Sequence, residues 1–184
     1  MVKSVQYRNV CDVIVRNNLC VGCGVCAGIC PESALTIGWN KYGELAPAEE
    51  SGKCSECGLC LESCPFWNQE ENENIMGEGE FKKTKDTKYN PVTGYYLGLF
   101  SGYSKVKNHR IRGASGGLTT WLLEKMISPE IADYACCVTH NKDPEKLFTY
   151  SALDSIDDIE RASRSVYYPV ESSGVIRAIL EREA

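Results

Sequence analysis

Apolar side chains recur at helical spacing in two stretches of the second half of the chain, which predicts amphipathic helices over 116–127 and 173–183. Two short apolar runs, over 133–140 and 147–153, have the length and composition of strands, and the first is typical of a buried strand. Ser155 precedes acidic residues in the position of a first helical turn, which predicts a capped helix there. Strands and helices therefore alternate in this half, as in an α/β domain.

The first 68 residues lack this periodicity and are dense in Cys, Gly and Pro. The stretch ALTIGWNKYGELAP, residues 34–47, predicts a β-hairpin with its turn at 40–43 and a returning strand that Pro47 ends. Residues 69–92 are polar, with a block of acidic side chains followed by a block of basic ones. This composition predicts a charged linker, and docking of a partner through the charges is the alternative.

Composition and charge narrow the class of protein. The chain has 184 residues, enough for one ordinary domain or two small ones, and a formal net charge of −5 that argues against binding to nucleic acid or anionic lipid. No apolar run approaches the length of a membrane span, and the N-terminus lacks the apolar core of a secretory signal. We therefore expect a cytoplasmic location, where the eleven cysteines are more often metal ligands than disulfides.

Eight cysteines form two copies of the pattern C-x-x-C-x-x-C-x-x-x-C-P. Two interpretations compete. Structural zinc is usually bound by two separate C-x-x-C pairs, whereas three cysteines at this close spacing, followed by a fourth, are typical of bacterial ferredoxins with two 4Fe–4S clusters. In that pattern the fourth cysteine binds the other cluster. The predicted ligands are Cys20, Cys23, Cys26 and Cys64 for the first cluster, and Cys54, Cys57, Cys60 and Cys30 for the second.

Two cross-linked clusters would brace a unit that is too small to be stable unaided, and would form a two-centre electron relay. A purely structural role is the alternative. The remaining thiols, Cys11, Cys136 and Cys137, lack cluster spacing. For the adjacent pair we expect small buried apolar side chains rather than a redox pair.

The stretch HRIRGASGGLTTWLLEKM, residues 109–126, carries the second chemical signal. Glycines and a serine before a helix expose backbone N–H groups that bind phosphate, and Arg110 and Arg112 lie just before them. A plain helix cap is the alternative. The two histidines, His109 and His140, have no catalytic spacing, and we expect His109 in a surface loop.

The cluster repeat, the acidic linker, RIRGASGGLTT and RASRSVYYPVESSGVIRAIL together resemble the beta subunit family of the coenzyme F(420) hydrogenases and dehydrogenases. The resemblance implies a flavoprotein in which iron–sulfur clusters exchange electrons with FAD, and FAD exchanges a hydride with a deazaflavin. It also implies flavin contacts, which fall on Arg110, Ser115, Gly116, Gly117 and Thr120.

The expected fold is an α+β ferredoxin-like two-cluster domain over 1–68, the linker over 69–92, and a partial α/β flavin-binding domain over 93–184. Family members continue into a strand with a Gly-x-Pro-Cys turn, which this sequence lacks, so we expect an incomplete flavin site. The apolar stripe of the last helix has no later strand in this chain to pack against.

The expected function is that of an iron–sulfur oxidoreductase subunit that relays electrons through two clusters to or from a flavin and a hydride acceptor. The acceptor is a coenzyme F(420)-type deazaflavin, a nicotinamide cofactor or another carrier, and the partners are a redox protein or other oxidoreductase subunits. The alternatives are a simple ferredoxin-like electron carrier and a non-catalytic truncated remnant. The sequence identifies no catalytic acid or base.

Overall fold

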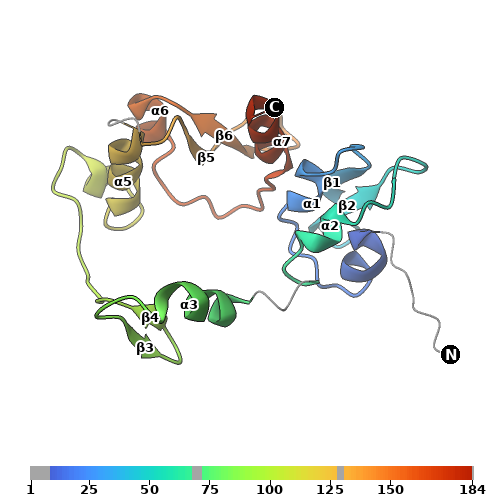
Figure 1. Cartoon of the computed structure of the whole chain (residues 1–184). Helices are drawn as coiled ribbons and strands as arrows, with labels where there is room; N and C mark the ends of the chain where they lie inside the picture. Colours follow the sequence, from blue (N-terminus) through green and yellow to red (C-terminus); the bar gives the residue numbers. More distant parts are fainter. Residues whose placement is uncertain (1–8, 68–71, 128–130, 184) are drawn as a thin grey trace.

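The computed structural model describes residues 9–67, 72–127 and 131–183. It combines helices with three small antiparallel sheets of two strands each. Figure 1 shows the cysteine-rich N-terminal part on the right, with α7 next to α1. Helices α5 and α6 lie on the left.

Residues 9–67 form one hairpin and three short helical segments. These are the π-helical turn η1 (Cys11–Val15), α1 (Val25–Gly28), β1 (Leu35–Trp39), β2 (Leu45–Glu49) and α2 (Leu59–Glu62). The predicted hairpin is confirmed, with Leu35 opposite Glu49 and Trp39 opposite Leu45. The prediction that Pro47 ends the second strand is wrong, because Pro47 lies inside β2, opposite Ile37. A hairpin of two strands tolerates proline, because each strand has a free edge where no N–H donor is needed.

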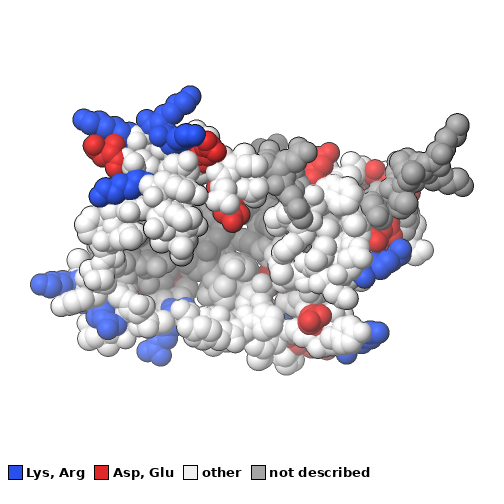
Figure 2. All heavy atoms as spheres, turned by 90° about the horizontal axis from the view of Figure 1, so that it is seen from below, with Lys and Arg blue, Asp and Glu red and all other residues white. Residues whose placement is uncertain are grey.

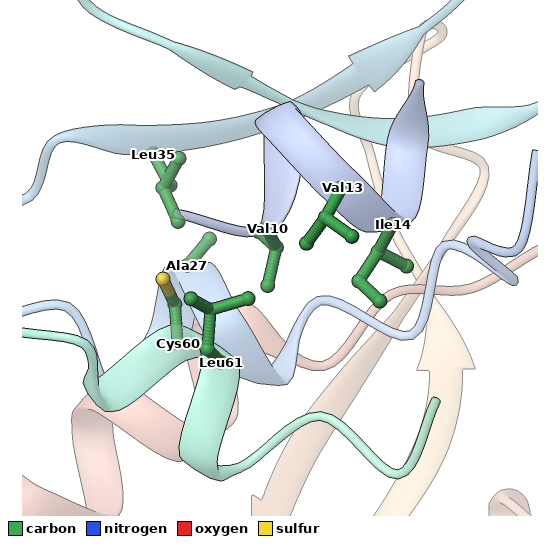
Figure 3. Close-up of a cluster of buried hydrophobic side chains, with 7 residues drawn as sticks. All are labelled: Val10, Val13, Ile14, Ala27, Leu35, Cys60 and Leu61. Atoms are coloured by element: carbon green, nitrogen blue, oxygen red, sulfur yellow. The ribbon is translucent and has the colours of Figure 1, made fainter. Parts of the chain in front are cut away.

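A small core joins these segments and includes one of the cysteines (Figure 3). Its members come from η1 and the residue before it, α1, β1 and α2; they are Val10, Val13, Ile14, Ala27, Leu35, Cys60 and Leu61. Further cysteines, among them Cys20, Cys26 and Cys64, pack against the core and are partly buried. Few apolar residues are available to stabilise this unit, so the cysteine loops form a large share of its interior.

The middle of the chain is more ordered than the predicted linker. Helix α3 (Glu73–Phe81) begins at Asn72, whose side chain accepts hydrogen bonds from the backbone N–H groups of Asn74 and Ile75. The hairpin of β3 (Lys88–Asn90) and β4 (Gly94–Tyr96) follows. Helix α3 buries no residue, and its neighbour is β4, so this stretch forms local structure without joining the main core.

The second half confirms the predicted elements but not their expected arrangement. It contains α4 (His109–Arg112), α5 (Leu118–Ile127), β5 (Ala135–His140), β6 (Phe148–Leu153), α6 (Ile156–Arg161) and α7 (Ser173–Glu183). Strands β5 and β6 pair antiparallel, from Ala135 opposite Leu153 to His140 opposite Phe148. The predicted cap is present, since the hydroxyl of Ser155 accepts from the N–H of Asp158 at 3.2 Å. The sheet of the expected partial α/β domain is therefore, in the described part of this half, a two-stranded antiparallel hairpin.

Helix α7 packs against α1, a segment about 150 residues earlier in the chain. The backbone N–H and hydroxyl of Ser172 donate to the carbonyl oxygen of Cys23 at 2.9 and 2.7 Å, and the Arg177 guanidinium donates to that of Ala27 at 2.8 Å. The sequence offered no later strand for the apolar stripe of this helix to cover, and in the structure the helix packs on an earlier segment instead. Its partner is the first cysteine motif rather than a later strand.

Charged side chains are unevenly distributed on the face shown in Figure 2, where Lys and Arg gather mainly toward one end and much of the middle carries no charge. None of the helices in the described part of the chain has the length and apolar character needed to cross a lipid bilayer.

The close approach of α7 depends on Gly28. A Cβ atom built there would lie 2.8 Å from the Cβ of Ile176 and 3.0 Å from the carbonyl oxygen of Ser173. The equivalent position of the second motif is Glu62, which is exposed. We expect Gly28→Glu to destabilise the packing of α7 by about 1–3 kcal/mol, because an overpacked contact forces neighbouring backbone apart.

Hydrogen–deuterium exchange checks this prediction. In Gly28→Glu the α7 amides should exchange faster, whereas the matched control Glu62→Gly should leave them unchanged. Equal protection of α7 in both variants would show that the helix does not rely on this glycine.

Candidate functional site

The first three cysteines of the first motif line a cavity together with the last cysteine of the second. Cys20, Cys23 and Cys26 come from the loop before α1 and from α1 itself, and Cys64 follows α2. The remaining lining is largely apolar and includes Val10, Val21, Val25, Pro47 and Phe66. This cavity contains the four residues predicted for the first cluster.

A second cavity repeats this arrangement with the roles of the motifs exchanged. Its cysteines are Cys54, Cys57 and Cys60 from the second motif and Cys30 from the first. Asn9, Ala34, Leu35 and Leu59 complete much of its lining. The fold therefore carries the fourth cysteine of each motif to the other cavity, as the ferredoxin pattern predicts.

Left-handed backbone conformations bend the first loop around its cavity. Gly22 has φ +69° and Gly24 has φ +84°. A Cβ atom on Gly22 would lie 2.4 Å from the carbonyl oxygen of Leu45, and one on Gly24 would lie 2.6 Å from Glu171 Oε2. Glycine is therefore required at both positions, because of conformation and because of space.

N–H groups of the chain point at several of the sulfurs. The backbone N–H of Gly22 lies 3.4 Å from Cys20 Sγ, that of Ala34 lies 3.3 Å from Cys30 Sγ, and the Asn9 amide lies 3.6 Å from Cys54 Sγ. Hydrogen bonds to ligand sulfurs are one of the means by which a protein sets a cluster's reduction potential.

Burial acts against ionisation of these thiols. It is the main reason why the pKa of Cys26 rises to about 12, and it also raises the pKa values of Cys20 and Cys60. A thiolate at these positions needs a nearby positive charge, which iron would supply when bound, because cysteine binds metals as the thiolate.

The cysteines outside the motifs occupy different surroundings. Cys11 is partly buried, its Sγ lies 3.5 Å from the carbonyl oxygen of Pro47, and burial raises its pKa to about 11. Cys136 is exposed and Cys137 is only partly buried, so the expectation that this pair consists of small buried side chains is wrong. Both residues line a larger cavity in the second half of the chain.

That larger cavity has a volume of about 540 Å³, within the usual range for small-molecule sites. Its wall includes the glycine turn and the start of α5, part of β5 and the segment after α6. Four of the five predicted flavin contacts line it: Ser115, Gly116, Gly117 and Thr120.

Arginines are placed differently from the prediction. Arg110 donates a hydrogen bond to the carbonyl oxygen of Ser115, and Arg112 forms an ion pair with Glu160 at 2.7 Å. The arginine that lines the cavity is Arg164, whose Nε donates to the carbonyl oxygen of Arg112 at 3.2 Å. The family resemblance transferred no role to the stretch from Ser163 to Pro169, because its match to the family pattern is loose, so Arg164 was not among the predicted contacts.

The glycine turn is packed tightly against α4. Gly117 has φ +69°, and a Cβ atom there would lie 2.3 Å from the carbonyl oxygen of His109. The N–H of Ser104 donates to the carbonyl oxygen of Gly116 at 2.8 Å and holds the other side of the turn. The turn therefore has little freedom, which leaves it preorganised on the cavity wall.

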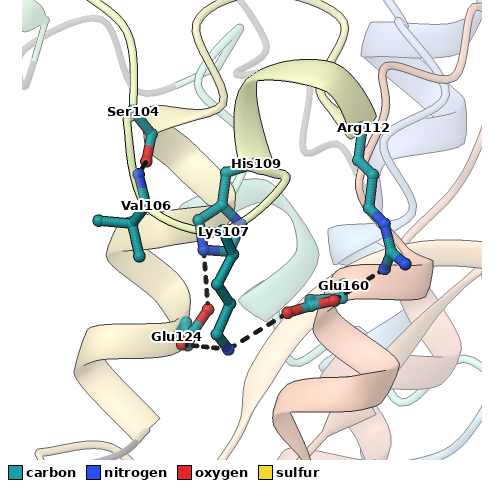
Figure 4. A network of polar contacts seen from close by, with 7 residues as sticks. All are labelled: Ser104, Val106, Lys107, His109, Arg112, Glu124 and Glu160. Atoms are coloured by element: carbon teal, nitrogen blue, oxygen red, sulfur yellow. Dashed lines mark hydrogen bonds and ion pairs between the residues drawn. The ribbon is translucent and has the colours of Figure 1, made fainter.

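An ionic network with a buried centre, formed by His109 and Glu124, holds the helices around this turn (Figure 4). His109 Nε2 lies 2.9 Å from Glu124 Oε2, and the Lys107 ammonium lies 2.8 Å from Glu124 and 3.4 Å from Glu160. His109 is 2% exposed, so its predicted place in a surface loop is wrong. The network joins α4, α5 and α6. It was not predicted from the sequence, because its charged residues are scattered along the chain.

The same network also brings three metal-ligating side chains together. Donor atoms of His109, Glu124 and Glu160 lie within 4.8 Å of one another. The ammonium of Lys107 contacts both carboxylates, and its hydrogen bond lowers the pKa of Glu124 despite the opposing effect of burial. A cation of the chain itself therefore neutralises this cluster, which functions as a structural clamp.

Comparison with protein families gives one match in each half of the chain. Residues 99–177 match the family described as coenzyme F420 hydrogenase/dehydrogenase, beta subunit N-terminal part, and residues 19–92 match the 4Fe–4S dicluster domain. The family resemblance predicted from the sequence is confirmed. The first half is a 4Fe–4S ferredoxin-type domain, and iron–sulfur clusters are the supported cofactors.

Curated relatives match mainly short stretches. A polyferredoxin protein MvhB from Methanothermus fervidus is 49% identical over 82 residues, which are 43% of this chain and 17% of the relative. One subunit of the Na(+)-translocating ferredoxin:NAD(+) oxidoreductase complex from Acetobacterium woodii is 39% identical over 46 residues, 25% of this chain and 13% of the relative. The chain thus spans less than a quarter of the length of these relatives.

We expect Glu124→Gln to loosen the clamp around the glycine turn. The change removes the buried negative charge that pairs with Lys107 and the carboxylate oxygen that faces His109 Nε2, which costs about 1–3 kcal/mol of stability. Denaturant unfolding measures this loss, and Glu80→Gln on the exposed α3 is the matched control. A variant as stable as the control would show that the network does not support the fold.

Proposed function

We propose that the chain is an electron-transfer subunit of an oxidoreductase in which two 4Fe–4S clusters relay electrons to or from a flavin. The observation that carries the relay is the exchange of the fourth cysteine between two four-cysteine cavities. The proposed ligands are those named from the sequence: Cys20, Cys23, Cys26 and Cys64 for one cluster, and Cys54, Cys57, Cys60 and Cys30 for the other.

The spacing of the sulfurs supports clusters over zinc. Tetrahedral zinc with Zn–S bonds of about 2.3 Å requires sulfurs about 3.8 Å apart. Among the described residues, no three cysteine sulfurs lie within 4.8 Å of one another. A four-iron cubane binds each cysteine at a different iron atom, so it accommodates the wider spacing.

The chain's own residues would bind the clusters, exclude water and set their potentials. A 4Fe–4S cluster supplies one-electron transfer when bound. Apolar side chains such as Val10, Val25 and Leu35 line the cavities and limit access of water. The N–H groups of Gly22, Ala34 and Asn9 stabilise negative charge on the ligand sulfurs.

We further propose that the cavity of about 540 Å³ binds the flavin. The turn at Ser115, Gly116 and Gly117 lies at the N-terminal end of α5, where backbone N–H groups favour a phosphate. Arg164 adds a positive charge on the same wall, and Arg110 positions Ser115 through its carbonyl oxygen rather than facing the ligand. Thr120, one turn into the helix, lines the same cavity.

This proposal divides the chain as the sequence suggests, with a cluster domain over 1–68, a connecting stretch over 69–92 and a flavin-binding part over 93–184. The matched relatives include a subunit of an oxidoreductase complex, which supports other redox subunits as partners. The second candidate, a plain ferredoxin-like carrier, is favoured by the polyferredoxin match. The two differ in whether a flavin binds.

Anaerobic reconstitution tests the cluster ligands. We expect about eight iron and eight sulfide per chain, because each 4Fe–4S cluster contains four of each. Cys30→Ser and Cys64→Ser should each impair a different cluster, and electron paramagnetic resonance of the reduced variants should lose the magnetic coupling between the two. Cys136→Ser, outside the motifs, is the control and should retain both clusters. One zinc ion per chain with no bound iron would overturn the relay.

Binding of FAD to the cluster-loaded chain tests the second part of the proposal. Loss of one charged hydrogen bond to phosphate weakens binding by about tenfold, so Arg164→Ala should raise the Kd by about that factor. Lys105→Ala, outside the cavity lining, is the control. The readout is the change in flavin absorbance and fluorescence on titration. Fully loaded clusters with no flavin binding would support the electron-carrier alternative.

A further inference from the structure

A further cavity, of about 390 Å³, lies between the hairpin of the cluster domain and the second half of the chain. One side is formed by residues of β1 and β2, including Trp39. The other side is formed by the turn between β5 and β6, the start of β6, and residues 168–171 before α7. Neither the cluster sites nor the flavin cavity uses it.

Three aromatic rings line this cavity, and the ring of Tyr168 contacts the other two. The ring centroids of Trp39 and Tyr168 are 6.3 Å apart at an interplanar angle of 82°, and those of Phe148 and Tyr168 are 5.5 Å apart at 52°. Trp39 remains 46% exposed although it packs on Tyr168. Aromatic faces that are still open in a cavity favour a planar ring as the ligand.

The charged lining is predominantly acidic. Asp143, Glu145 and Glu171 line the cavity, and Lys146 is the basic residue among its described lining. The Lys146 ammonium lies 3.2 Å from Glu171 Oε1. Burial raises the pKa of Glu171, but hydrogen bonds from Ser173 and Lys146 outweigh it and hold the pKa below the ordinary value, so the carboxylate stays charged.

One short segment connects this cavity to the first cysteine loop. Glu171 Oε2 accepts from the N–H of Ser173 at 2.7 Å, and a Cβ atom on Gly24 would lie 2.6 Å from the same oxygen. The next residue, Ser172, donates twice to the carbonyl oxygen of Cys23, which lines the first four-cysteine cavity. The corresponding glycine of the second motif, Gly58, has nothing within 4 Å of such a Cβ position. Residues 171 and 172 therefore link the wall of this cavity to the first cysteine loop and not to the second.

We propose that this cavity binds a planar, positively charged heteroaromatic ring, the class to which an oxidised nicotinamide ring belongs. The rings of Trp39, Phe148 and Tyr168 attract a cation at their faces, and the excess of carboxylates favours the same charge. The flavin cavity has the opposite preference, since its glycine turn and Arg164 favour an anion. Ring binding stands by itself; only a role of the ring as electron acceptor rests on the proposed function.

Three probes of similar size and different charge test the site: the 1-methylnicotinamide cation, neutral nicotinamide and the nicotinate anion. Saturation-transfer NMR on the cluster-loaded protein measures their Kd values. We expect the cation to bind at least about fivefold more tightly than the neutral ring, which is the factor that a cation–π contact supplies, and the anion to bind most weakly. Equal binding of all three, or no binding of the cation at millimolar concentration, would overturn the site.

Charge variants should change the affinity for the cation in opposite directions, which a general loss of structure would not do. Lys146→Gln should tighten binding of the cation, because it leaves the carboxylates unopposed, and Glu171→Gln should weaken it. Lys53→Gln changes net charge equally, but Lys53 pairs with Glu50 on the cluster hairpin side and is outside the cavity lining, so it should have no effect. If Lys146→Gln weakened binding, or if Lys53→Gln matched it, the site would be wrong.

Substitution of one aromatic side chain tests whether the cation binds in this cavity. Trp39→Leu should weaken cation binding at least fivefold, whereas Trp67→Leu, an exposed tryptophan outside the cavity lining, should not. Iron and sulfide content, measured on the same samples, separates the two proposals. Loaded clusters without ring binding overturn this site and leave the relay intact, while ring binding in protein that takes up zinc in place of iron overturns the relay and leaves the site.

Discussion

The exchange of cysteines between two four-cysteine cavities is the constraint on which the rest of the structure depends. Each cavity takes three thiols from one motif and the fourth from the other, so the segment containing η1, α1, the hairpin and α2 closes on itself. The apolar core of this unit has seven buried members and includes one of these cysteines. A core of this size stabilises little by itself, and metal bound at the cysteines would contribute its binding free energy directly to folding.

The two motifs are repeats in sequence but not in surroundings. Gly24 and Gly28 of the first motif are approached by residues 171–176, whereas a Cβ atom at the equivalent Gly58 of the second has nothing within 4 Å, and Glu62 is exposed. The first cysteine loop is therefore covered by the second half of the chain, and the second loop is not. The second half of the chain, which carries the cavity proposed for the flavin and one side of the acidic aromatic cavity, is therefore in contact with the first motif.

The second half of the chain has few buried apolar residues and uses ionic contacts to arrange its helices. Glu124 is buried between His109 and Lys107, and Lys107 and Arg112 both reach Glu160 on α6. Buried charges of this kind are costly unless each one is paired, so the network is sensitive to loss of any member. The network holds the glycine turn in place on the wall of the cavity of about 540 Å³.

The sequence by itself determined the local elements and the chemistry of the thiols. Helical and strand periodicity located α5, α7, β5 and β6, and the cap at Ser155 began α6, because these signals act within a few residues. The cysteine spacing predicted the two sets of four. Helix α3 was missed, since its low apolar content resembles that of a linker and its capping residue Asn72 is the main signal.

Tertiary structure alone decided which distant residues meet. The burial of His109, the position of Arg164 in the cavity, the antiparallel pairing of β5 with β6 and the contact of Ser172 with Cys23 depend on groups that lie far apart in sequence. No local pattern encodes such contacts, because they depend on how whole elements pack. The sequence determined what the cluster loops can bind, and the packing of α7 determined which of them faces the rest of the protein.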